Sequence, residues 1–131
     1  MPRTLPVAHP HYLASLLLLG AVTLFTGCGG DDSAAVQKLK TLGVGLGYDE
    51  NGAVNEVDFS GSKATDADVA LLRRLPGVTT IYVGEALGDE GLEQLAPLKK
   101  LQGLDVSKTE VTYDGVKALN RLLPRCRIAF R

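Results

Sequence analysis

The sequence LQGLDVSKTEVTYDGVKALNRLLP, residues 101–124, contains two different hydrophobic periods in succession. Its first half follows an L-x-x-L-x-L type of pattern, in which apolar residues alternate as they do in a short strand. In its second half Val116, Leu119 and Leu122 are spaced three residues apart, which is typical of one face of a helix. The stretch therefore predicts a strand followed by a helix.

Two upstream stretches repeat this pattern, namely residues 54–77 (VNEVDFSGSKATDADVALLRRLPG) and residues 78–100 (VTTIYVGEALGDEGLEQLAPLKK). Apolar columns keep their register across the three units at steps of 23 or 24 residues. These columns are Val57/Ile81/Leu104, Phe59/Val83/Val106, Val69/Leu92/Val116, Leu72/Leu95/Leu119 and Leu75/Leu98/Leu122. A strand and a helix within each such unit are typical of a leucine-rich repeat.

The expected helix ends carry matching polar residues. Thr65 and Thr112 stand where an N-cap side chain would accept a free backbone N–H, and Gly88 replaces them in the second unit. Acidic residues follow each N-cap and basic residues close each helix, which complements the helix dipole. Much of the charge of the chain therefore has a structural explanation and needs no ligand.

The third unit resembles the bacterial leucine-rich repeats of the form L-x-L-x-x-T-x-V-T-D-x-G-L-x-x-L. The matching residues are Leu104, Val106, Thr109, Val111, Thr112, Gly115, Val116 and Leu119. Tyr113 replaces Asp in the third unit. In the two earlier units Ser62 and Ala86 replace Thr, and Asp68 of the first unit replaces Gly. The resemblance covers residues 54–130. It implies an α/β fold, a short leucine-rich repeat solenoid with parallel strands on one face and helices on the other.

The two ends of the repeat region differ from its interior. Residues 33–53 are expected to form an N-terminal cap, with a helix over 33–42 that stops at Gly43 and a β-hairpin around Asn51-Gly52. Residues 54–131 are expected to hold about three repeats and a final strand, because Ile128 and Phe130 continue the strand columns.

The N-terminal 27 residues are typical of a signal peptide. The apolar run 13–25 is too short for a membrane-spanning helix, which needs about 20 residues. It ends in Phe-Thr-Gly before Cys28, which resembles the lipobox of bacterial lipoproteins. The resemblance implies cleavage before Cys28 and its lipidation with acyl chains such as palmitate. The protein would then be anchored to a membrane at the cell envelope, with residues 28–32 as a tether. The alternative is an ordinary cleaved signal with an incidental cysteine.

Composition argues against several classes of function. A formal net charge of −1 lacks the basic excess of nucleic-acid-binding proteins. His9 and His11 both precede Cys28, so the mature chain would lack the base of a Ser/His/Asp or Cys/His site. No residue spacing indicates a metal site or a cofactor. We therefore expect no enzyme, with a hydrolase using Asp58 and Asp105 as the least favoured alternative.

Binding to an unknown protein partner is the function we expect, with a purely structural role in the envelope as the alternative. In this type of repeat, the residues between the apolar strand anchors form an open strand face. The candidate binding residues on it are Glu56, Asp58, Ser60, Thr80, Tyr82, Asp105, Ser107 and Arg127. Tyr82 is the first candidate because Tyr is a common interface anchor; the alternative is an ordinary exposed strand tyrosine.

Cys126 lies in the turn before the last expected strand. Free cysteines usually behave as small buried hydrophobic residues, and we favour burial for this one. The alternative is an exposed thiol that pairs between chains, as a single leftover cysteine in an exported protein can do.

Overall fold

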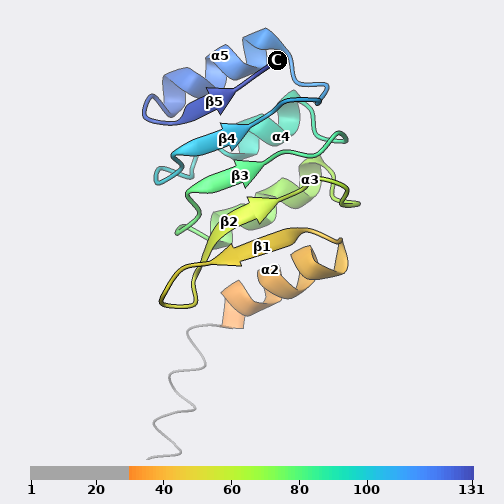
Figure 1. Cartoon of the computed structure of the whole chain (residues 1–131), viewed down its shortest axis with the longest axis vertical. Coiled ribbons are helices and arrows are strands. Elements are labelled where there is room, and N and C mark those ends of the chain that lie inside the picture. Colours follow the sequence, from red (N-terminus) through yellow and green to blue (C-terminus); the bar gives the residue numbers. More distant parts are fainter. Residues whose placement is uncertain (1–29) are drawn as a thin grey trace, which may run out of the picture. The chain divides into compact units, whose positions relative to one another are not determined.

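The computed structural model describes residues 30–131, with side chains from Ser33 onward (Figure 1). The expected signal peptide, residues 1–27, and the candidate lipidation site Cys28 lie outside the described residues. Residues 34–131 form one compact unit. Among residues 30–131, no helix is both long enough and apolar enough to cross a membrane.

The fold is a small α/β domain with a five-stranded mixed sheet of order β1-β2-β3-β4-β5. The strands are β1 (Gly45–Tyr48), β2 (Val54–Asp58), β3 (Thr80–Tyr82), β4 (Gly103–Asp105) and β5 (Arg127–Ala129). The helices are α2 (Gly30–Thr41), α3 (Asp66–Val69), the 3₁₀ helix η2 (Ala70–Arg74), α4 (Asp89–Gln94) and α5 (Tyr113–Leu122). Strands β2 to β5 are parallel and alternate with helices on one side of the sheet (Figure 1).

The register of the parallel strands confirms the strand columns that the repeats predict. Val57 pairs with Ile81, Ile81 with Leu104, and Leu104 with Ile128. The first three of these side chains are at most 2% exposed. Their columns form the part of the core between the sheet and the helices, where aliphatic side chains of neighbouring units lie against one another.

One predicted helix column is wrong in the third unit. Leu75 and Leu98 are buried as expected, but Leu122 is 55% exposed and Leu123 takes its place in the core. The inward position shifts by one residue because the third unit ends in an α turn, whereas the first two units end in 3₁₀ turns. The N–H groups of Leu75 and Leu98 bond to carbonyls three residues earlier, whereas the N–H of Leu123 bonds to Leu119, four residues earlier. A 3₁₀ turn repeats every three residues and an α turn every 3.6, so the longer α5 displaces its inward position by one.

The N-terminal cap forms a helix and a hairpin, as predicted, with shifted boundaries. Helix α2 begins at Gly30, so residues 30–32, which we expected in the tether, belong to it. No proline interrupts residues 30–33, and Asp and Ser are common at helix starts. Leu39 of α2 is fully buried.

The hairpin loop is built around Asp49. Its carboxylate Oδ1 accepts the N–H groups of Asn51 and Ala53 at 2.8 and 2.9 Å. The N–H of Gly52 donates to the carbonyl of Asp49, and Gly52 has φ +81°, which glycine tolerates best. The Asn-Gly pair therefore predicts the turn correctly.

Cys126 occupies a core position and is 6% exposed, which confirms the predicted burial. Its backbone N–H bonds to Leu123, just as the N–H of Val78 bonds to Leu75 and that of Leu101 to Leu98. Cys126 is therefore the third-unit equivalent of two buried aliphatic residues. Burial raises the pKa of its thiol, which keeps it in the less reactive neutral form.

Candidate functional site

The candidate binding residues come together on the open face of the sheet. One row crosses the strands as Asp58, Tyr82, Asp105 and Ala129, and a second row as Glu56, Thr80, Gly103 and Arg127. Ser60 and Ser107 follow the ends of β2 and β4. The pairing thus places all eight predicted residues on or directly beside one surface, which we call the strand face.

Tyr82 is the central side chain of the strand face. It is 39% exposed and lies in register between Asp58 and Asp105. The fold therefore leaves one partly exposed aromatic side chain in the middle of this face.

The two aspartates beside Tyr82 are partly occupied by turns. Oδ1 of Asp58 accepts the N–H of Ser60, and Oδ1 of Asp105 accepts the N–H of Ser107, both at 2.8 Å. The hydrogen bonds from Ser107 lower the pKa of Asp105, and the nearby charges of Arg131 and Lys108 act in the same direction. Each carboxylate ends its strand in an Asx turn.

A second polar arrangement links successive units on the helix side. Oδ1 of Asp66, the first residue of α3, accepts the N–H of Gly88, the N-cap of α4, at 2.9 Å. Asp89, the first residue of α4, accepts the N–H of Thr112 at 2.8 Å and its hydroxyl at 2.6 Å. Thr112 is the N-cap of α5. We refer to these contacts as the carboxylate ladder, because each unit supplies the acid that fixes the next helix start.

The carboxylate ladder explains two glycines. A Cβ on Gly91 would lie 2.6 Å from Oδ1 of Asp66, and a Cβ on Gly115 would overlap the carboxylate of Asp89. Both glycines are the third residue of their helix. They are needed because the carboxylate of the preceding unit fills the space where a side chain would be.

Both ends of the carboxylate ladder depart from the repeat pattern. In the first unit Asp68 replaces the glycine, since no earlier unit sends a carboxylate there, and it accepts the N–H of Thr65 at 3.0 Å. In the third unit Tyr113 replaces the aspartate, and its ring packs on Phe130 with centroids 6.3 Å apart. Asp66 and Asp89 are among the acidic residues after the N-caps that the sequence pattern attributed to the helix dipole alone, so their contacts between units were not predicted.

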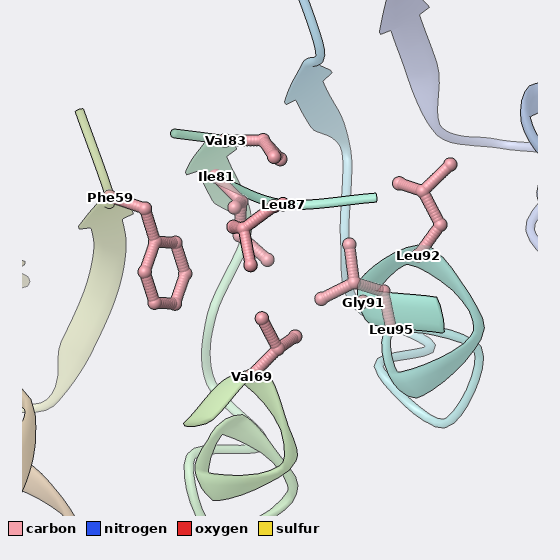
Figure 2. A pocket seen from close by; sticks show the side chains of 8 residues that line it. All are labelled: Phe59, Val69, Ile81, Val83, Leu87, Gly91, Leu92 and Leu95. Carbon is pink, nitrogen blue, oxygen red and sulfur yellow. The ribbon is translucent and has the colours of Figure 1, made fainter. Parts of the chain in front are cut away.

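The internal cavity between the sheet and the helices is too small for a ligand. Its volume is about 10 Å³, roughly the space of one water. Figure 2 shows the side chains that surround it, which come from β2 to α4: Phe59, Val69, Ile81, Val83, Leu87, Gly91, Leu92 and Leu95. All are apolar, so the cavity is a packing gap.

Larger hollows lie away from the strand face. One groove of about 250 Å³ runs between α4 and α5 and is lined by Asp89, Ala118 and Leu122 among others. Another of similar volume lies beside Cys126 and Lys99. Within residues 30–131, no group of three or more His, Cys, Asp or Glu is placed to hold a metal ion.

The geometry therefore defines an α/β repeat domain with an open strand face. No family model matches the chain, and a comparison with curated proteins found no match.

Proposed function

We propose that this chain is a lipid-anchored leucine-rich-repeat protein whose strand face binds a protein partner at the cell envelope. The units of 23 or 24 residues, their in-register strands and the carboxylate ladder support the repeat assignment. The lipobox-like sequence before Cys28 supports the anchor.

The observation that carries the binding proposal is the position of Tyr82. The neighbouring aspartates have a structural task in turns, whereas the Tyr82 ring has none that would require its exposure. An exposed tyrosine between two carboxylates suits a partner side chain that combines a cation with an apolar stem, such as Arg or Lys. A face only a few strands wide is smaller than the roughly 800 Å² per partner of a standard interface, so the interaction is weak or multivalent.

Site-specific photo-crosslinking tests the strand face. A photoreactive residue at position 82, expressed in the native envelope, should yield a discrete crosslinked protein. The matched control carries the same residue at Glu90, which is exposed on α4 on the other side of the sheet. The proposal fails if position 82 gives no product, or if both positions give the same products.

Mass spectrometry of the native N-terminus tests the anchor. The expected product begins at Cys28 and carries acyl chains, and Cys28→Ser should release the protein from the membrane fraction. An unmodified N-terminus at any position would overturn the anchor, while leaving the strand-face proposal to its own test.

A further inference from the structure

Among residues 30–131, strand β5 pairs with another strand on one side only. The sheet order places it at an edge. The N–H of Arg127 donates to Gln102 at 2.8 Å, and the carbonyl of Ala129 accepts from Val106 at 2.9 Å, so both residues bond inward to the β4 side. Backbone groups alternate along a strand, and those of Ile128 therefore point outward from the sheet. An edge of this kind is a template for another strand.

Apolar side chains flank this edge on the helix side. Ile128 and Val116 are only partly buried against the core. Phe130 is 40% exposed, and Tyr113, which packs on it, is 63% exposed. We call these four residues the end face. The equivalents of Ile128 in the interior strands, Ile81 and Leu104, are at most 2% exposed.

Positive charge dominates the same end of the chain. Residues 115–131 contain five basic residues and no acidic ones: Lys117, Arg121, Arg125, Arg127 and Arg131. Arg127 continues the row of the strand face that begins with Glu56. Both Arg127 and Arg131 are exposed. A neighbour at this edge meets arginines on one side and apolar groups on the other.

We propose that the β5 edge binds an extended acidic segment of a partner protein, which adds to the sheet as a further strand. Alternate residues of this segment are apolar and lie against Ile128 and Phe130. The residues between them are Asp or Glu and lie beside Arg127 and Arg131. A strand supplies both features at once because its side chains alternate between two faces.

A second copy of the chain fits this edge poorly. Pairing two β5 edges would bring Arg127 and Arg131 of one copy toward the same residues of the other, and like charges across strands are destabilising. An anionic membrane would attract the arginines but would not pair with the outward backbone groups of Ile128. The β5 edge shares Arg127 with the strand face but does not include Tyr82, on which the strand-face proposal depends, so the two proposals are tested separately.

Peptide titration against the full chain provides the test. The probe is a fluorescent eight-residue peptide of alternating Glu and Val, with an alternating Lys and Val peptide as the charge control. We expect the acidic peptide alone to bind. Arg127→Glu with Arg131→Glu should weaken binding at least tenfold.

Two matched controls separate this edge from the rest of the surface. Arg73→Glu with Arg74→Glu makes the same charge change at exposed positions of η2, and Tyr82→Ala alters the strand face. Both should leave the affinity within twofold of the parent. Equal weakening by the η2 pair would overturn the proposal, because attraction would then follow net charge. If the Glu variants do not fold, Arg127→Gln with Arg131→Gln replaces them.

Amide hydrogen exchange reports the backbone pairing directly. Bound acidic peptide should slow exchange at Ile128 at least tenfold, with little change at Arg127, whose N–H is already bonded. Peptide binding without protection at Ile128 would overturn the strand model. So would arginine-dependent binding to vesicles of phosphatidylglycerol without peptide binding, or a dimer in sedimentation that the double variant abolishes.

Discussion

The two ends of the repeat region differ in how far their apolar side chains are covered. At the N-terminal end, α2 and the antiparallel hairpin cover the first unit, and Leu39 and Val44 are 0% and 5% exposed. At the C-terminal end, β5 is the edge strand of the sheet among residues 30–131, and Tyr113 and Phe130 are 63% and 40% exposed. Apolar side chains are therefore buried at the N-terminal end and partly exposed at the C-terminal end. This difference indicates that the N-terminal end contributes more to the stability of the fold.

The chemistry of the two ends follows this difference. Asp68, at the N-terminal end, binds its own N-cap and lies 3.8 Å from Lys38 of the capping helix. Tyr113, at the C-terminal end, packs on the ring of Phe130. The departures at Asp68 and Tyr113 thus lie in the first and the last unit of residues 54–131.

The largest difference between the two ends should appear on truncation of their apolar residues. Leu39→Ala opens a cavity at a fully buried position and should lower the free energy of unfolding by about 2–5 kcal/mol. Phe130→Ala removes a ring that is 40% exposed and should cost about 1 kcal/mol. Urea denaturation measures both. Equal losses would contradict the assignment of the N-terminal end as the stabilising one.

The stability of the repeat units between the two ends depends on the carboxylate ladder. Gly115→Ala places a methyl group against the Asp89 carboxylate and should cost about 1–3 kcal/mol. Gly103→Ala is the control, because the nearest atom to its added Cβ is Thr80 Cγ2 at 3.9 Å. Combining Gly115→Ala with Asp89→Ala should cost less than the sum of the single changes. Additive losses would show that the ladder does not set the need for glycine.

Thiol labelling compares the local opening of the two ends. Cys126 is buried under the open end, and Ala35 is buried at 2% exposure under the closed end. In a Cys28→Ser background, Cys126 should react about tenfold faster than a cysteine introduced by Ala35→Cys with Cys126→Ala. That ratio corresponds to about 1.4 kcal/mol in opening free energy. Faster labelling at position 35 would reverse the comparison.

Acid should weaken the interior of the repeats by a smaller amount. Hydrogen bonds from Thr112 lower the pKa of Asp89 in the folded chain. A lowered folded pKa gives stability that is complete above the unfolded pKa, about 3.9, and is lost as pH falls through the folded value. The urea midpoint should therefore decrease on acidification below about pH 5. Asp89→Asn should flatten this decrease more than Glu90→Gln, which makes the same charge change on the same helix.

The sequence predicts the columns and the strand register well, because a repeat of nearly constant length forces equivalent residues into neighbouring strands. It misplaces Leu122, since a shift between 3₁₀ and α geometry moves an inward position by one residue without changing the spacing of leucines. It also misses the carboxylate ladder. Asp66 and Asp89 are 23 residues apart, and Gly91 and Gly115 are 24 apart, so the signal was present. A dipole argument within one helix does not reveal a contact between helices.

The candidate site was likewise predictable from the sequence only in part. The row through Asp58, Tyr82 and Asp105 follows from register alone, and the structure contains it. The Asx turns that occupy both aspartates depend on local backbone geometry, which the pattern of residue types does not specify. The partly exposed end face was also not anticipated, because a repeat pattern describes units that have neighbours on both sides.

In each contact of the carboxylate ladder, the acid precedes its partner in the sequence and is therefore synthesised first. Asp66 precedes the N-cap that it binds by 22 residues, and Asp89 precedes its own by 23. During synthesis from the N-terminus, each new helix start therefore emerges after the group that will hold it has already been made. The order in which the ribosome delivers the units is the order in which they can be completed.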